Sequence, residues 1–321
     1  MAYRKSQNLR PEIVFLMGPT AAGKTDTAVY LAEKLNSEIV SCDSMQIYKD
    51  MDIMTSKPVG CVLKKTRHHL IGVVSPENEY NVSKYRLDAL RAIKKIIKRG
   101  KVPLFVGGTG LYMTILLDGI FNLKVKSQKM RERLYKQAEK SGSAYLHKKL
   151  QKIDPDAAAK IHPNDLKRII RALEVYEVTG KPISMLQKNR HGLWDEYGVK
   201  IFCLDMERGK LYNRIDSRVE KMFKKGLIKE AKRLLNMKLS RTASAAIGLK
   251  EVKGYLEGSY GLQETKELMK RNTRQYAKKQ LTWFRKDKRI QWINVAQNDT
   301  PAKITERIWK GINGKSASRN G

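Results

Sequence analysis

The chain contains few cysteines and no long apolar run. Its three cysteines, Cys42, Cys61 and Cys203, are widely spaced among 321 residues. This number and spacing exclude a disulfide framework and a cysteine-based zinc pair, so we expect reduced thiols in or near the core. No stretch approaches the roughly 18 to 20 apolar residues of a membrane-spanning helix, and Met1 to Arg10 lacks the apolar centre of a signal peptide. We therefore expect a cytoplasmic protein without a membrane partner.

Acidic residues are scarce relative to basic ones. The chain has 65 Lys and Arg against 32 Asp and Glu, which gives a formal net charge of +33. This surplus exceeds what solubility requires and favours a polyanionic partner, most often nucleic acid. A general preference for lysine across the proteome is the alternative explanation.

A glycine-rich octapeptide carries the clearest chemical signal. The sequence GPTAAGKT follows the apolar run Ile13 to Met17 and precedes a helix-like segment, which is the order of a P-loop. In such a loop the main-chain N–H groups and the helix N-terminus hold phosphates, Lys24 reaches the terminal phosphates and Thr25 ligates Mg²⁺. The motif predicts a diphosphate or triphosphate ligand and leaves the reaction open. The candidate diphosphate-binding residues are Gly18, Pro19, Thr20, Ala21, Ala22, Gly23, Lys24 and Thr25.

Short apolar runs alternate with helical stretches along most of the chain. This alternation predicts an α/β fold with a P-loop NTPase-like core, in which helices flank a mostly parallel sheet. The predicted strands are Ile13 to Met17, Glu38 to Cys42, Val102 to Val106, Val199 to Leu204 and Ile290 to Val295.

Strand patterns stop in the middle of the chain, where helical periodicity predicts an all-helical insertion. We therefore expect core residues 1–119, a helical insertion at 120–198, further core at 199–312 and a disordered tail at 313–321. The second core segment includes a long helix near Leu268 to Arg289 with one apolar face and one basic face. A solvated surface or phosphate contact would each explain the basic face.

Asp43 directly follows the second predicted strand. We expect Glu38 to Cys42 to run parallel beside the first strand, which would bring Asp43 to the ligand-binding edge of the sheet. There a carboxylate would bind Mg²⁺ through water in a kinase, or accept a proton in a group transferase. A turn cap is the third interpretation, since Asp followed by Ser is common in turns.

Seven more short runs accompany the octapeptide in a fixed order. They are DSMQIY from Asp43, MDI from Met51, HHL from His68, VGGTGLY from Val106, RIIRALE from Arg168, RIDSRV from Arg214 and QLTWFR from Gln280. With these runs the chain closely resembles the bacterial tRNA dimethylallyltransferases, also called tRNA isopentenyltransferases, from about Ile13 to Trp292. Each run alone is weak apart from the P-loop, but eight in the correct order are specific.

The resemblance implies transfer of a dimethylallyl group from dimethylallyl diphosphate to N6 of the adenosine on the 3′ side of the anticodon. An allylic diphosphate ionises when the departing diphosphate is stabilised, here by the P-loop, Lys24, Mg²⁺ on Thr25 and Arg218, which matches the family position for a further cation. The adenine amine is a poor nucleophile, so a base is needed, and Asp43 is the candidate. Thr109 completes the candidate catalytic set, and members of this family usually act as monomers.

The resemblance also implies contacts with the anticodon stem-loop of tRNA. The target adenosine must leave its stack to reach the base, with the insertion and the core holding the loop from two sides. At Lys167 relatives usually have Gln, and Asn122 to Gln128 departs from a proline- and acid-containing family stretch. The candidate tRNA-binding residues are Asp43, Ser44, Met45, Gln46, Thr109, Lys167, Arg168, Ile169, Ile170 and Arg171.

Several alternatives remain open at this stage. An isopentenyltransferase acting on free adenine nucleotides would share the phosphate chemistry, and a small-molecule P-loop kinase would share the loop and Mg²⁺. A basic RNA-binding protein with a degenerate nucleotide fold is the non-enzymatic alternative. His68 and His69 lack partners at metal-ligand spacing and are interpreted as structural. Trp283 and Phe284 belong to the core or line a prenyl pocket.

Overall fold

The computed structural model describes residues 12–58, 60, 63, 65–120, 128–188 and 190–313. Within them the chain divides into two compact units, a core formed by residues up to Ile115 and from Glu196 onward, and a helical unit of Leu116–Asp195. The sequence placed the helical insertion at 120–198. Cys61, Met1 to Arg10, most of the Asn122 to Gln128 stretch and residues 314–321 of the predicted tail lie outside the described residues, whereas Asn313 ends a helix.

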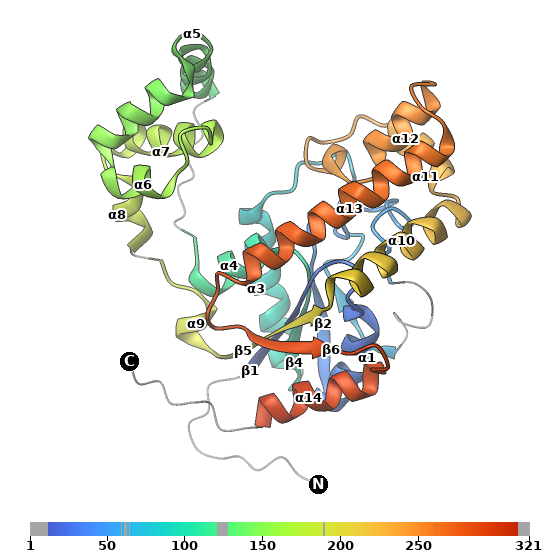
Figure 1. Cartoon of the computed structure of the whole chain (residues 1–321). Coiled ribbons are helices and arrows are strands. Elements are labelled where there is room, and N and C mark those ends of the chain that lie inside the picture. The colour runs from blue at the N-terminus through green and yellow to red at the C-terminus, as the bar shows by residue number, and fades with distance from the viewer. Residues whose placement is uncertain are drawn as a thin grey trace. The chain divides into compact units, whose positions relative to one another are not determined.

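The core unit contains a six-stranded, entirely parallel sheet (Figure 1). Its spatial order is β3-β2-β4-β1-β5-β6. All five strands that the sequence predicts are present, and the α/β class is confirmed. The two-residue strand β3 was missed because two residues carry no periodicity. The strands are β1 (Glu12–Met17), β2 (Ser37–Cys42), β3 (His68–His69), β4 (Val102–Gly107), β5 (Gly198–Met206) and β6 (Gln291–Val295).

The expected position of β2 beside β1 is wrong. Strand β4 lies between them, because Leu104 of β4 is in register with Val14 of β1 on one side and with Ile39 of β2 on the other. The crossover connections, which local sequence does not encode, leave a gap beside β1 that β4 fills. Asp43 still lies at the carboxyl edge, and the end of β4 separates it from the P-loop.

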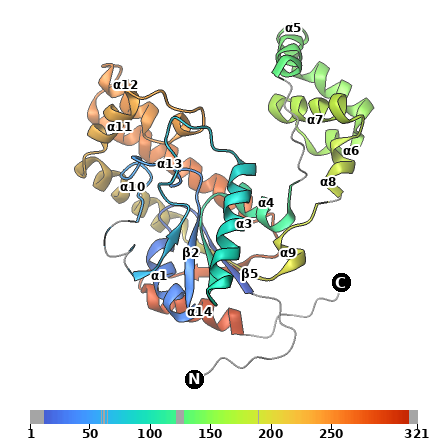
Figure 2. The same ribbon diagram turned by 180° about the vertical axis from the view of Figure 1, so that it is seen from behind.

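Helices cover both faces of this sheet (Figures 1 and 2). On one face α1 (Lys24–Leu35) and α14 (Pro301–Asn313) pack against each other and share an apolar cluster with Val14 and Leu16. The alternate side chains of the strands point the other way, where Phe15 and Phe105 stack at 4.7 Å and α3 (Val82–Lys98) packs on β2 and β4. The strands are therefore buried on both sides, as a parallel sheet requires.

The remaining helices of the core position the candidate site. Helices α10 and α13 pack against each other, as do α11 and α12. Helix α4 begins at the end of β4 and runs across the boundary into the helical unit. These helices are α4 (Gly110–Asp118), α10 (Arg208–Lys224), α11 (Leu227–Leu235), α12 (Leu249–Leu256) and α13 (Leu262–Phe284).

The described part of the helical unit contains helices only. Its apolar side chains form a separate core that includes Leu134, Leu150 and Leu173. A buried carboxylate, Glu174, binds Arg131 in a bidentate pair at 2.8 Å. None of the helices among the described residues combines the length and the apolar composition that a membrane span requires. The helices are α5 (Gln128–Ile153), α6 (Pro155–Lys160), α7 (Leu166–Thr179), α8 (Ile183–Lys188) and α9 (Leu193–Glu196).

Candidate active site

The P-loop connects β1 to the first turn of α1. Gly23 adopts φ +91° immediately before the helix, a left-handed conformation that side chains rarely accept, so the loop can turn there. The N-terminal N–H groups of α1 have no partners within the helix and carry the positive end of its dipole. The geometry therefore provides an anion site at Gly18 to Thr25.

The side chain of Lys24 is folded back onto the loop. Its Nζ donates hydrogen bonds to the carbonyl oxygens of Gly18 at 2.9 Å and Pro19 at 2.6 Å. Burial lowers the pKa of Lys24 to about 8, an effect that the carboxylate of Asp43 opposes and the guanidinium of Arg218 reinforces. A bound phosphate would favour the charged ammonium and replace these loop carbonyls as its partner.

The two carboxylate oxygens of Asp43 have different surroundings. Its Oδ1 accepts hydrogen bonds from the main-chain N–H groups of Met45 at 2.9 Å and Gln46 at 3.3 Å, which caps the turn after β2. Its Oδ2 forms no hydrogen bond to any described residue, and the side chain lines a cavity. The turn interpretation therefore holds for one oxygen and leaves the other available as a proton acceptor.

Thr109 ties the end of β4 to this turn. Its Oγ1 accepts the main-chain N–H of Ser44 at 3.0 Å and donates to Ser44 Oγ at 3.3 Å. Tyr276 of α13 also forms a side-chain hydrogen bond with Thr109. The candidate catalytic Thr109 therefore fixes the position of Asp43 and its turn.

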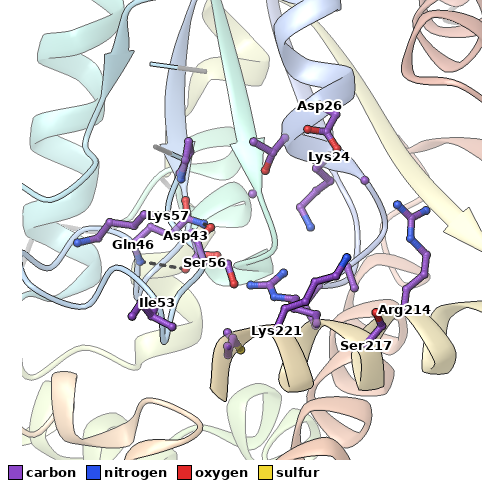
Figure 3. A pocket seen from close by; sticks show the side chains of 18 of the residues that line it. Lys24, Asp26, Asp43, Gln46, Ile53, Ser56, Lys57, Arg214, Ser217 and Lys221 are labelled. Carbon is purple, nitrogen blue, oxygen red and sulfur yellow. Dashed lines mark hydrogen bonds between the residues drawn. The ribbon is translucent and has the colours of Figure 1, made fainter. Parts of the chain in front are cut away.

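These elements surround a cavity of about 1040 Å³ that is lined entirely by the core unit. Lys24, Thr25, Asp43 and Arg218 all line it, so the structure brings together residues that are far apart in the sequence. Burial lowers the pKa of Arg218, whereas Asp43 raises it, and one of its terminal nitrogens donates to Thr55 O at 3.3 Å. Figure 3 shows Lys24 and Asp43 on different walls, with a row of α10 side chains along a third.

A smaller and more apolar cavity of about 190 Å³ shares Asp43 and Arg218 with the large one. Its apolar lining includes the candidate residue Met45. A charged cavity and an apolar one therefore meet at the same carboxylate. The apolar residues of the small cavity are Met45, Met54, Val219, Met222, Ala245, Ala246, Ile247 and Met269.

The cavity wall fits the Mg²⁺ ion that the P-loop motif implies. The hydroxyl of Thr25 lines the cavity without a hydrogen-bond partner among the described residues, and Asp43 lines it from another side. No cluster of three His, Cys, Asp or Glu side chains occurs in the described part of the chain. Mg²⁺ usually binds one or two protein oxygens together with water and substrate phosphates, so this sparse set of oxygen donors suits it.

Two structurally important side chains were not identified as site residues from the sequence. The buried amide of Gln280 accepts the N–H of Thr20 and donates to Gly108 O, both at 2.9 Å. Gln280 did carry a signal, since it begins the QLTWFR run and lies on the apolar face predicted for its helix. The second is Glu230 of α11, a carboxylate on the buried face of its helix. A charged residue at a position where helical periodicity predicts burial is the one sequence feature that would have pointed to it.

Glu230 holds one wall of the cavity. Its carboxylate accepts the N–H groups of Asp52 at 3.0 Å, Ile53 at 2.8 Å and Met54 at 2.8 Å. Asp52, Ile53 and Lys57 of the following segment line the large cavity. Gln46, another candidate residue, supports the same segment by donating to Thr55 O at 3.3 Å.

The candidate tRNA-binding run of α7 separates into surface and core residues. Lys167 and Arg168 are exposed, whereas the side chains of Ile169 and Ile170 are buried in the core of the helical unit. Arg171 is half-buried and pairs with Glu174 at 2.7 Å. Arg168 pairs with Asp165 at 3.1 Å but its side chain is 63% exposed, so the exposed cations of this run are Lys167 and Arg168.

Other residues considered in the sequence have structural surroundings. His69 pairs with the buried Glu38 at 2.7 Å, which agrees with the structural interpretation of the two histidines. Cys42 and Cys203 are buried free thiols, and burial raises the pKa of Cys42 to about 12. Phe284 is fully buried and Trp283 is 38% exposed, and neither lines the two cavities.

This fold and site define a P-loop α/β protein in which the loop, an anion site by its geometry, and a carboxylate line one cavity. Comparison with known proteins specifies the family. The family model described as IPP transferase matches residues 46–287, and the chain belongs to this family.

Relatives and solved structures agree with this assignment. The chain is 47% identical to a tRNA dimethylallyltransferase of Carboxydothermus hydrogenoformans, covering 92% of this chain and 96% of the relative. It is 43% identical to one of Alkaliphilus oremlandii, covering 95% and 98%. The full-length tRNA isopentenylpyrophosphate transferase of Bacillus halodurans matches with a TM-score of 0.70 and 39% identity over 94% of this chain and 96% of that one. A eukaryotic dimethylallyltransferase acting on tRNA matches with a TM-score of 0.80 and 29% identity over 94% and 78%.

Proposed function

We propose that this chain is a tRNA dimethylallyltransferase. It transfers a dimethylallyl group from dimethylallyl diphosphate to N6 of the adenosine 3′-adjacent to the anticodon and releases diphosphate. The observation that carries the proposal is that the P-loop, with Lys24, and the free carboxylate oxygen of Asp43 line one cavity. The names of the relatives, which span nearly the whole chain, support the same activity.

In the proposed reaction the bond between C1 of the allyl group and the diphosphate oxygen breaks, and the diphosphate leaves with the electron pair. The N–H groups of the P-loop, Lys24 and Arg218 stabilise the developing negative charge. Bound through Thr25, Mg²⁺ would neutralise further charge on the diphosphate. The N6 lone pair forms the new bond to C1, and the N6 proton passes to Oδ2 of Asp43.

The small cavity beside Asp43 suits the dimethylallyl group. Its apolar lining matches a branched five-carbon chain, while Asp43 and Arg218 mark its boundary with the phosphate-binding cavity. An allyl group placed there would have its reactive carbon close to the carboxylate. Thr109 and Ser44 would hold this carboxylate in place as the adenine, extruded from its stack, enters.

The proposed partner is the anticodon stem-loop of tRNA. Lys167 and Arg168 on the helical unit and Asp43 to Gln46 on the core are the proposed contacts. We propose that the enzyme acts as a monomer. We place the activity in the cytoplasm, where tRNA is available.

The test is incubation of the protein with tRNA, Mg²⁺ and dimethylallyl diphosphate, followed by mass spectrometry of the nucleosides. N6-(dimethylallyl)adenosine is expected in tRNA. The Asp43→Asn variant is a sharp control, because its amide oxygen can still cap the turn while the base is lost. Turnover should fall by at least about a hundredfold with tRNA affinity unchanged. Prenylation of free AMP in preference to tRNA, or phosphoryl transfer from ATP to an acceptor, would contradict the proposal.

A further inference from the structure

Helix α10 carries two charged faces with different partners. On the first face, its acidic side chains pair with basic side chains of α13. Asp216 pairs with Arg274 at 3.3 Å, and Glu220 pairs with Lys266 at 2.9 Å and Lys270 at 2.8 Å. Two cations of the basic face predicted for the long helix, Lys270 and Arg274, therefore join α10 and α13.

The second face of α10 is basic and lines the large cavity. Arg214, Arg218, Lys221 and the C-cap residue Lys225 follow one another at intervals of four, three and four residues. This spacing places them along one side of the helix. Figure 3 shows Arg214, Ser217 and Lys221 in a row along it.

Three of these cations lack acidic partners. Arg214, Lys221 and Lys225 are exposed, and their side chains form no ion pair with any described residue. The acidic side chains along the cavity are Asp26, Asp43 and Asp52, and Asp52 already binds Lys57 at 2.7 Å. A row of unpaired cations in a concave wall attracts anions and concentrates them there.

One end of this row reaches the P-loop. A β-carbon added at Gly23 would lie 3.5 Å from a terminal nitrogen of Arg214. The guanidinium of Arg214 is therefore next to the loop where the phosphates are expected to bind. Lys221 and Lys225 continue the positive surface along the cavity wall, away from the loop.

We propose that Arg214, Lys221 and Lys225 form a second diphosphate-binding surface, the α10 track, which captures the diphosphate of the donor and delivers it to the P-loop. The inference rests on the proposed function and adds three residues to its donor site. Arg214 contacts the outer oxygens of the bound diphosphate, and the two lysines act during its approach. A guanidinium is suited to this contact because its planar donors match two phosphate oxygens at once.

A simpler explanation is that cations near the end of α10 stabilise the helix dipole. Lys224 lies in the same last turn, is exposed and does not line the cavity. Lys229 and Lys232 of α11 are exposed and do not line it either. These three lysines provide a matched control with the same change in net charge.

The experiment compares a track variant, Arg214→Gln with Lys221→Gln and Lys225→Gln, with a control variant, Lys224→Gln with Lys229→Gln and Lys232→Gln. The track variant should raise the KM for dimethylallyl diphosphate about tenfold at low salt, since electrostatic capture contributes factors of this order. Its KM for tRNA should change less than about twofold, and kcat/KM for the donor should depend less on salt. The control variant should match the wild type in all of these constants.

Binding of inorganic diphosphate, measured by calorimetry, tests the track without turnover. Weaker binding to the track variant alone supports the proposal, whereas equal binding to both variants and the wild type overturns it. A raised KM for tRNA with an unchanged donor KM would also overturn it, because the row would then serve RNA. If the wild type binds diphosphate through the track but produces no prenylated tRNA, the proposed function fails and the anion site stands.

Discussion

The side-chain carbonyl of Gln280 accepts the main-chain N–H of Thr20 at 2.9 Å. Through its Nε2 the same amide donates to Gly108 O at 2.9 Å, and a β-carbon at Gly108 would lie only 2.1 Å from that nitrogen. One buried side chain of α13 thus holds the P-loop and the loop after β4 at a set distance. The P-loop and the Asp43 turn are positioned relative to each other through this amide and Thr109.

Replacing Gln280 with Leu should weaken both the fold and the donor site. The change leaves the buried N–H of Thr20 and the carbonyl of Gly108 without partners, at a cost of about 2 to 4 kcal/mol in the free energy of unfolding. We also expect a KM for the donor raised at least about fivefold, because the P-loop loses its support. Urea unfolding and steady-state kinetics measure the two effects. A Thr282→Ala variant on the exposed side of α13 is the control, and a normal donor KM in Gln280→Leu would refute the positioning role.

The lowered pKa of Lys24 predicts a pH dependence of donor capture. With a pKa of about 8 in the free protein, Lys24 loses its proton as the pH rises through 8, and kcat/KM for the donor should fall there. The value of kcat should be less sensitive, because a bound diphosphate favours the charged form. Lys24→Arg, although less active, should show no such fall. A kcat/KM that stays constant to pH 9.5 in the wild type would contradict the prediction.

The same shift predicts how stability changes with pH. Between about 8 and the ordinary value of 10.5, the unfolded chain holds a proton on Lys24 that the folded chain has lost. The contribution of Lys24 to the free energy of unfolding therefore rises with pH across this window. The difference between wild type and Lys24→Met, measured by urea unfolding at pH 7.5 and 10, isolates this contribution. A difference that does not change with pH would show that the pKa is not lowered.

Glu230 offers a test of the cavity wall that does not touch the reacting groups. Glu230→Gln places an amide NH₂ against main-chain N–H groups and should lower the free energy of unfolding by about 2 kcal/mol. The segment from Asp52 to Lys57 should then become more open to proteolysis, and substrate KM values should rise. Arg233→Gln, which removes an exposed contact to Asp50 O at 3.1 Å, is the control with a small effect. If the KM values and the rate of proteolysis are unchanged in Glu230→Gln, Glu230 contributes to stability alone and does not hold the cavity wall in place.

The exposed cations of α7 should contribute to RNA affinity through phosphate contacts. Lys167→Gln together with Arg168→Gln should weaken tRNA binding and reduce the slope of log K against log salt by about 1 to 2. Donor KM should not change, since neither residue lines the cavity. Lys160→Gln with Lys181→Gln, at exposed positions elsewhere on the helical unit, is the matched control. If both double variants show the wild-type salt slope, Lys167 and Arg168 lie outside the interface.

Short-range sequence patterns predicted much of the fold and part of the candidate site. The P-loop, five of the six strands and the all-helical character of the described helical unit follow from glycine spacing, β-branched runs and helical periodicity, which constrain neighbouring residues directly. Asp43 was singled out because it follows a strand, and that reasoning holds although the neighbouring strand was misplaced. The burial of Ile169 and Ile170 also follows from helical periodicity. The family motif alone does not distinguish buried from exposed residues within Lys167 to Arg171.

The sequence by itself determined the phosphate loop, the alternation of strands and helices and the excess of positive charge, because each depends on residues close together in the chain or on composition. Only the tertiary structure decided that β4 separates β1 from β2, that Gln280 reaches Thr20 and that Arg214 lies beside Gly23. These relationships join residues up to 260 positions apart. They depend on which helix packs on which strand, and that choice is made by the whole core rather than by any local segment.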